Sequence, residues 1–198
     1  MIYVDGFNLY FGMLEAGLGN CKWLNIRKLI DNFLKPKQQV VSIKYFTSRV
    51  SNNPGKQKRQ STYLEALEAV DIEIIYGRYQ VNNVECHRCG NIWKEPNEKM
   101  TDVNIATQMI IDGFENKYDA AILISGDSDL VPPIKAVHSH FADKRVTVFF
   151  PPKRYNSSVA AIAKGSLIIG RKKLADSQFS NDVLSKNGFN LRKPVDWM

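Results

Sequence analysis

Residues 120–129 read Ala-Ala-Ile-Leu-Ile-Ser-Gly-Asp-Ser-Asp and give the clearest indication of the fold class. Five apolar residues in succession predict a short strand that is buried on both faces, as in a parallel sheet covered by helices. The polar residues that follow predict a turn at the carboxyl end of that strand. Residues 2–6, Ile-Tyr-Val-Asp-Gly, repeat the pattern on a smaller scale, with an acid directly after a short apolar run.

Strands and helices are expected to alternate on either side of this stretch. The expected strands are residues 2–4, 40–49, 72–76, 120–124 and 146–150. The expected helices are residues 8–16, 26–34, 56–70, 103–114, 130–140 and 155–163. This alternation predicts an α/β fold with a mainly parallel sheet and helices on both faces.

The crossovers leave no room for a second core, so a single domain is expected over residues 1–170. Within it, the polar residues 79–98 are interpreted as an excursion from the fold. Residues 171–198 form a C-terminal extension that either packs on the domain or holds a partner.

Composition excludes several classes of protein. Of the 198 residues, 44% are hydrophobic and 24% are charged, which is typical of a globular chain. No apolar run approaches the roughly 20 residues of a membrane span, and the first residues do not resemble a secretory leader. Three cysteines do not make a disulfide framework. We therefore expect a cytoplasmic protein without a membrane partner.

Charge is distributed unevenly along the chain, whose net charge is +7. Residues 22–60 hold ten Lys or Arg against one acid, and residues 140–198 hold eleven against four. Residues 61–139 hold thirteen acids against six Lys or Arg. The basic stretches favour a polyanionic partner, while the acids are either scattered over the surface or gathered around a cation.

Four aspartates are candidates for one cleft. Asp5 follows the first strand, Asp127 and Asp129 follow strand 120–124, and Asp102 opens helix 103–114. Ligands of such sheets bind beyond the carboxyl ends of the strands. Each acid alone is also typical of a helix cap or a turn. Two carboxylates about 5 Å apart repel by about 3 kcal/mol at an effective dielectric constant of about 20, so four together favour Mg²⁺ or Mn²⁺ as a cofactor.

Three segments carry a resemblance to a known family. Residues 3–9 (Tyr-Val-Asp-Gly-Phe-Asn-Leu), 98–104 (Glu-Lys-Met-Thr-Asp-Val-Asn) and 125–130 (Ser-Gly-Asp-Ser-Asp-Leu) resemble, in order and spacing, the NYN domain family of PIN-like nucleases. The resemblance covers about the first 165 residues, and residues 192–197 are similar to the tail of bacterial members.

The resemblance implies a three-layer α/β/α fold of the PIN-like (Rossmannoid) type and metal-dependent cleavage of RNA. The metal-binding and catalytic acids that it implies are Asp5, Asp102, Asp127 and Asp129. Asn8 would support these acids or the scissile phosphate.

Five residues are expected to contact the substrate, Arg49 and Arg154 because they lie at the same edge of the sheet and Lys99 because it precedes Asp102 in the segment that carries the resemblance. They are Asn8, Arg49, Lys99, Ser125 and Arg154. Lys56, Lys58 and Arg59 begin the helix at 56–70, where charge and helix dipole attract phosphate. Tyr45, Phe46 and Tyr155 are candidates for stacking on bases, which favours single-stranded RNA. The alternative is that these lysines are solvated surface and these aromatic residues are core.

Cys86 and Cys89 form half of a zinc knuckle, Cys-His-Arg-Cys. Structural zinc needs four ligands, and Cys21, His87, His138 and His140 do not stand at a recognised spacing from this pair. The pair is therefore either a metal-free turn or half of a Zn²⁺ site that a homodimer completes.

Three functions compete on these residues. The first is a metal-dependent ribonuclease, and the second is a non-catalytic module that binds RNA or protein. The third, a phosphotransfer enzyme, is disfavoured because Phe7 stands where such phosphatases carry a second Asp. The chain also lacks a Gly-rich nucleotide-binding loop.

Overall fold

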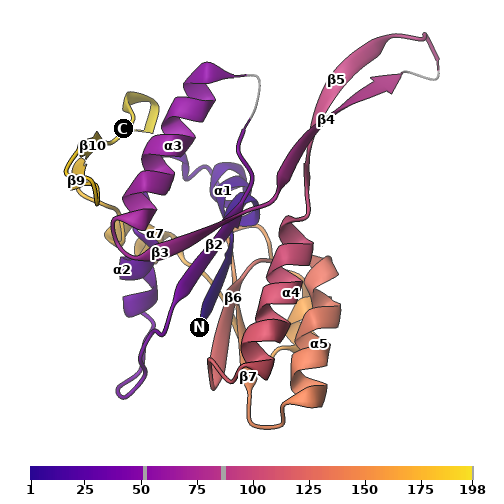
Figure 1. The fold of residues 1–198 in the computed structure, drawn as a ribbon, viewed down its shortest axis with the longest axis vertical. Coiled ribbons are helices and arrows are strands. Elements are labelled where there is room, and N and C mark those ends of the chain that lie inside the picture. Colours follow the sequence, from indigo (N-terminus) through magenta and orange to yellow (C-terminus); the bar gives the residue numbers. More distant parts are fainter. Residues whose placement is uncertain (51–52, 86–87, 198) are drawn as a thin grey trace.

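The computed structural model describes residues 1–50, 53–85 and 88–197, and for residues 79–84 and 93–99 it describes the backbone alone. Its centre is a six-stranded sheet in the order β3-β2-β1-β6-β7-β8, in which every neighbouring pair is parallel (Figure 1). The strands are β1 (Ile2–Asp5), β2 (Ile43–Thr47), β3 (Ile72–Tyr76), β6 (Ala120–Ile124), β7 (Arg145–Phe150) and β8 (Gly165–Ile168). The expected α/β fold with a parallel sheet is confirmed.

Helices cover both faces of this sheet. The helices are α1 (Gly6–Glu15), α2 (Ile26–Asp31), α3 (Pro54–Glu68), α4 (Thr101–Phe114), α5 (Val131–His140), α6 (Ser157–Ile162) and α7 (Arg171–Asp176), with 3-10 turns η1 (Gly19–Cys21), η2 (Ser128–Leu130) and η3 (Val195–Trp197). One hydrophobic cluster joins α1, α2 and α3 to the sheet, and a second cluster joins α4, α5 and α6 to its other face. Strand β1 contributes to both clusters: Ile2 and Val4 belong to the first and Tyr3 to the second. This is because successive side chains of a strand point to opposite faces of the sheet.

The order of the strands reverses between β1 and β6. From β1 the chain adds β2 and β3 on one side, and it then returns to add β6, β7 and β8 on the other. Helix α1, which directly follows β1, and helix α5, which follows β6 after a short loop, therefore pack on opposite faces of the sheet. Ligands of open α/β sheets bind at such a reversal point.

Two features of the chain were not predicted from the sequence, namely the strands of a projecting hairpin and the edge strand β8. Residues 79–98, interpreted as an excursion, belong to an antiparallel hairpin of β4 (Arg78–Glu85) and β5 (Ile92–Lys99), which extends away from the sheet and helices (Figure 1). Strand β8 was not predicted, because its four residues read Gly-Ser-Leu-Ile and lie at the sheet edge.

The C-terminal segment packs on the α1–α3 face. It contains α7 and a hairpin of β9 (Asp182–Leu184) and β10 (Asn190–Arg192). Phe179, Leu191 and Trp197 join the same hydrophobic cluster as α1, α2 and α3. The indole nitrogen of Trp23 donates a hydrogen bond of 2.7 Å to the carbonyl of Ser180. Aromatic contacts with Trp23 therefore hold the end of the described chain against the core.

In the part of the chain that the structure describes, none of the helices is both long enough and apolar enough to span a membrane.

Candidate active site

Asp5 lies at the carboxyl end of β1 and is almost completely buried, with 5% of its surface exposed. Its Oδ1 accepts a hydrogen bond of 3.0 Å from the backbone N–H of Asn8, so that Asp5 caps the start of α1. Its Oδ2 accepts a hydrogen bond of 2.9 Å from the hydroxyl of Ser125, which follows β6. Asp5 thus links the start of α1 to the loop after β6, on either side of the reversal point.

A second pair of hydrogen bonds strengthens this connection. The backbone N–H of Gly126 donates to Oδ1 of Asn8 at 3.0 Å, and the N–H of Asp127 donates to the hydroxyl of Ser125 at 3.1 Å. Only glycine fits at position 126, because an added Cβ would lie 1.8 Å from the carbonyl oxygen of Arg154. The start of α1 and the loops that follow β6 and β7 are therefore packed together tightly.

The next aspartate of the candidate site, Asp102, belongs to α4. It occupies the first turn of α4, after Met100, whose φ of 75° lies in the left-handed region. Burial raises the pKa of the half-buried Asp102 carboxyl, and the charges of Asp127 and Asp129 raise it further.

Burial likewise raises the pKa of Asp5, to about 6, against the lowering effect of its hydrogen bonds to Asn8 and Ser125. The charges of Asp102 and Asp127 add to that increase in the pKa of Asp5. Asp127 therefore acts electrostatically on both Asp5 and Asp102, and Asp129 acts on Asp102.

Two of these acids also act as caps, as the alternative interpretation expected. Asp5 caps α1, and Oδ1 of Asp127 accepts a hydrogen bond of 2.9 Å from the N–H of Asp129 at the start of η2. Capping and ion binding are compatible for Asp127, because the cap uses one carboxylate oxygen. Asp129 is exposed.

The donor set fits a divalent cation with its water shell. Across residues 1–50, 53–85 and 88–197, no three His, Cys, Asp or Glu side chains are grouped closely enough to hold one metal ion. The four carboxyl groups are nevertheless hard oxygen donors, and none of the ion pairs among described residues involves them. Mg²⁺ commonly binds through one or two carboxylates and keeps several waters. The arrangement therefore suits an ion that shares its shell with water and substrate.

The two arginines expected at this edge have protein partners. The guanidinium of Arg49 donates a hydrogen bond of 3.2 Å to the hydroxyl of Tyr76 and lies 4.7 Å from the centre of that ring. Arg154 forms an ion pair with Glu15 of α1. Lys99 is the last residue of β5, and its side chain lies outside the described atoms. A role of these residues in substrate binding stays a prediction.

Two of the aromatic residues proposed for base stacking are core residues. Phe46 is fully buried, and the ring of Tyr45, 6% exposed, packs against Gly6. Tyr155 is 59% exposed and rests edge-on against Phe150, so it alone of the three keeps a free ring face.

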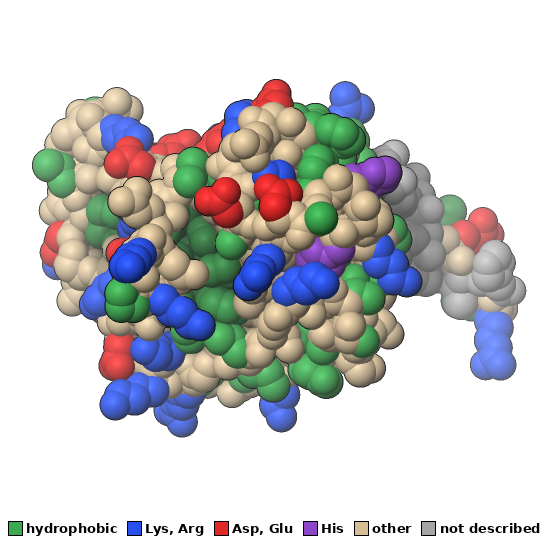
Figure 2. Space-filling model, turned by 90° about the horizontal axis from the view of Figure 1, so that it is seen from below, with side chains coloured by type: hydrophobic (Ala, Val, Ile, Leu, Met, Phe, Trp, Pro, Cys, Tyr) green, Lys and Arg blue, Asp and Glu red, His purple; other side chains and the backbone are tan. Residues whose placement is uncertain are grey.

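The basic stretch 22–60 is divided between the two edges of the sheet. Lys56 lies in the first turn of α3, which follows β2 at the carboxyl edge. Lys35 and Lys37 precede β2 and so lie toward the amino edge, at the opposite end of the molecule. Figure 2 shows that opposite end, where Lys and Arg side chains are spread widely. Positive charge is therefore not confined to the acid-bearing edge.

Only one cysteine of the Cys86–Cys89 pair lies among the described residues. Cys86 lies outside the described residues, and Cys89 is an exposed free thiol near the turn between β4 and β5. A zinc site shared by a homodimer stays a prediction.

A pocket that the sequence did not predict lies between α1, α3 and the C-terminal segment. Its volume is about 380 Å³. Gly6, directly after Asp5, is part of its lining, together with Tyr10, Tyr63 and Trp197. The one signal in the sequence was the spacing of Phe7, Tyr10, Phe11 and Leu14, which places four apolar side chains on one helix face.

Comparisons with known proteins agree with this architecture. A crystal structure of a protein of unknown function from Vibrio parahaemolyticus has a similar fold, with a TM-score of 0.58 and 24% identity, covering 86% of this chain and 91% of that chain. The chain is also 29% identical to 6-hydroxy-3-succinoylpyridine 3-monooxygenase HspA from Pseudomonas putida, across 79% of this chain and 61% of HspA. It thus matches less than two thirds of that relative.

The family model of the NYN domain matches residues 1–169, which include the four aspartates and the whole six-stranded sheet. The chain therefore belongs to the NYN domain family, whose members are nuclease-like modules of the PIN type.

Proposed function

We propose that this protein is a metal-dependent ribonuclease that hydrolyses phosphodiester bonds of single-stranded RNA at the carboxyl ends of β1 and β6. The observation that carries the proposal is the electrostatic coupling of aspartates at the carboxyl edge of the sheet: burial and neighbouring acids raise the pKa of both Asp5 and Asp102, and Asp127 contributes to both shifts. Neighbouring carboxylates without a compensating cation repel one another. A bound cation that also holds a phosphate ligand would offset this repulsion.

Asp5, Asp102, Asp127 and Asp129 would hold Mg²⁺ or Mn²⁺. When bound, such an ion activates water for in-line attack on phosphorus and stabilises the leaving oxygen. Ser125 and the N–H of Asn8 orient Asp5 through its two oxygens. Asn8 in turn holds the loop of Asp127 through Gly126. These contacts keep the carboxylates in place before substrate arrives, which reduces the reorganisation needed for catalysis.

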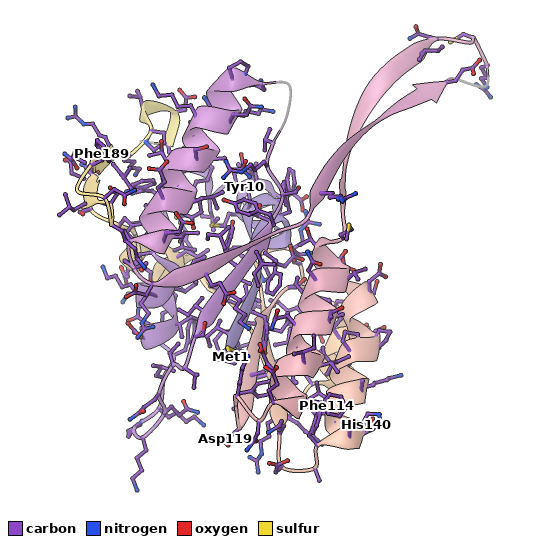
Figure 3. The ribbon with its side chains drawn as sticks, viewed as in Figure 1. Met1, Tyr10, Phe114, Asp119, His140 and Phe189 are labelled. Carbon is purple, nitrogen blue, oxygen red and sulfur yellow. The ribbon has the colours of Figure 1, made fainter. Side chains whose placement is uncertain are left out.

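Cleavage of RNA tests the proposal directly. The purified chain, stripped with EDTA and then supplied with Mn²⁺ or Mg²⁺, should cut end-labelled single-stranded RNAs of mixed sequence. Asp127→Asn should abolish cleavage, because it removes a charged ligand while its Oδ1 can still cap η2. Asp119→Asn is the matched control, since Asp119 is an exposed aspartate at the far end of the molecule (Figure 3).

Intact RNA in the presence of either ion, with a folded protein by circular dichroism, would reject the ribonuclease. If RNA still binds, and binding survives both EDTA and Asp5→Asn, the protein is instead a non-catalytic binding module of the same fold.

A second enzymatic candidate comes from the relative HspA, whose name describes a monooxygenase of a hydroxylated pyridine. Hydroxylation of a small aromatic acid would require O₂ and a reductant. The test is to incubate the protein with 6-hydroxy-3-succinoylpyridine, NADH and O₂. Oxygen uptake that depends on the pyridine would favour this activity over RNA cleavage.

A further inference from the structure

The pocket beside the aspartates has aromatic residues on several sides. Helix α1 contributes Phe7, Tyr10 and Phe11 to its lining, which also includes Tyr45, Tyr63 and Trp197. Figure 3 shows Tyr10 on α1, behind α3 in that view. A volume of about 380 Å³ lies within the usual range of small-molecule sites, about 300–1,000 Å³. The pocket is thus suited to a flat ring rather than to an isolated ion.

Helix α1 presents more apolar surface than the core uses. Leu9 and Met13 are buried against the sheet, whereas Phe11 and Leu14 remain 44% and 38% exposed on the pocket side. Phe7 and Phe11 stack on each other with ring centres 6.0 Å apart. An exposed apolar patch that lines a concavity marks a ligand site more often than a lone apolar residue does.

The charges around the pocket leave an excess of positive charge. Lys22, Lys56 and Arg59 belong to its lining, and Asp196 is its one acid. Arg59 is neutralised by an ion pair of 2.7 Å with Asp196. The ammonium group of Lys22 lies 5.4 Å from the Trp197 ring, and Lys56 is exposed in the first turn of α3. Two cations therefore remain for an anionic ligand.

The position of the pocket connects it to the proposed cleavage site. Gly6 lines the pocket, and Asp5, the preceding residue, belongs to the acid cluster. Thr47 and Val50, also in the lining, lie at the carboxyl end of the neighbouring strand β2. A strand of RNA with a phosphodiester at the aspartates would therefore place an adjacent nucleotide over this pocket.

We propose that this pocket holds one base of the RNA substrate, stacked against the aromatic side chains of α1, while Lys22 and Lys56 contact the flanking phosphates. This inference rests on the proposed function and deepens it by assigning a base-binding site. Stacking on an aromatic ring tolerates any base, so the pocket adds affinity and register more than sequence specificity.

Binding in EDTA tests the base site separately from cleavage. The probe is a short single-stranded RNA with one 2-aminopurine, whose fluorescence is quenched when the base stacks. Tyr10→Leu should reduce the quenching and weaken binding about 5- to 150-fold, the range for losing one stacked base. Tyr10→Phe, which keeps the ring, should bind like the native protein. Phe114→Leu is the control, because Phe114 is 68% exposed and lies on α4, far from the pocket (Figure 3).

The phosphate contacts have their own readout. Lys56→Gln should reduce the slope of log affinity against log salt concentration by about 0.7, the change for one phosphate contact to a single strand. Lys135→Gln, an exposed lysine on α5 across the sheet, should leave the slope unchanged.

Two results would overturn the base site. One is unchanged quenching and affinity in a folded Tyr10→Leu protein. The other is equal affinity for RNAs in which each nucleotide in turn is made abasic. Either result alongside Mn²⁺-dependent cleavage removes the base site and leaves the ribonuclease. Quenching that depends on Tyr10, without cleavage in Mn²⁺ or Mg²⁺, removes the ribonuclease and leaves a base-binding protein.

Discussion

The hydroxyl of Ser125 donates a hydrogen bond of 2.9 Å to Oδ2 of Asp5, although 120 residues separate the two in the chain. The bond crosses from the end of β6 to the end of β1 at the point where the sheet order reverses. This hydrogen bond lowers the pKa of the Asp5 carboxyl group, whereas burial raises that pKa. Ser125 therefore helps to keep Asp5 available as a charged ligand.

Ser125→Ala should weaken both stability and cation binding. The substitution removes the donor to Asp5 and the acceptor for the N–H of Asp127. Leaving such buried partners unpaired costs about 1–3 kcal/mol of unfolding free energy, measurable by urea denaturation. The pKa of Asp5 should rise further, so Mn²⁺-dependent activity should need a higher pH. An unchanged pH profile would show that Ser125 has no influence on Asp5.

Asp5→Asn should make the metal-free protein more stable than the native protein above about pH 6. The pKa of Asp5 is about 6 in the folded state, against 3.8 for an unperturbed aspartate such as that of the unfolded chain. The folded state therefore holds the proton more tightly, and it loses stability as the pH rises from about 4 to about 6. The loss is about 3 kcal/mol for such a shift.

Urea denaturation in EDTA between pH 4 and 8 measures this effect as the difference between native protein and variant. Asp119→Asn should follow the native protein at every pH. Saturating Mn²⁺ should reverse the difference between native protein and Asp5→Asn, because the ion stabilises the charged form of Asp5. A constant difference across the range would contradict the burial of a titrating Asp5.

Gly126→Ala should disturb the site by displacing backbone. The new Cβ would lie 1.8 Å from the carbonyl oxygen of Arg154, an atom that cannot move without its loop. Overpacking of this kind costs about 1–3 kcal/mol, and cleavage should fall because the loop carrying Asp127 shifts. Gly170→Ala is the matched control, since nothing lies within 4 Å of its added Cβ. Full activity in Gly126→Ala would contradict the tight packing.

Lys44→Met should be the most destabilising of these changes. Lys44 and Asp112 form an ion pair of 2.6 Å whose side chains are 7% and 0% exposed. Tyr3 and Gln108 also donate to Asp112. Removing the lysine leaves a buried carboxylate without its main cation, which costs about 3–5 kcal/mol.

Lys186→Met provides the comparison for that prediction. Lys186 pairs with Asp71 at 2.7 Å, but both side chains are largely exposed. Losing an exposed pair of this kind costs about 0–1 kcal/mol. Equal losses in the two variants would mean that burial does not determine the strength of the Lys44–Asp112 pair.

Much of the fold was predictable because many of its strands and helices have short-range patterns of apolar residues. The apolar run at 120–124 and the helical spacing of residues 103–114 identify elements without knowledge of their neighbours. Strand β8 and the β4–β5 hairpin were not identified. β8 is short and lies at the sheet edge, and the two hairpin strands pair only with each other, so neither carries the apolar signal of a central strand.

Some residues of the candidate site could likewise be identified from the sequence, and the positions of others could not. Asp5 and Asp127 were identifiable because each follows a short apolar strand, and Asp102 because it opens a helix. The core positions of Tyr45 and Phe46 could not be inferred, because aromatic residues at a strand end serve equally well in a core or on a surface.

From the sequence followed the α/β class, the order of the elements other than β8 and the hairpins, and the choice of four candidate acids. These depend on residues a few positions apart, whose spacing sets helix faces and strand faces directly. Tertiary structure alone decided that Ser125 reaches Asp5 and that α1, α3 and Trp197 enclose one pocket. Such contacts depend on which strands pair and in what register, and pairing is set by the packing of the whole core rather than by any local pattern.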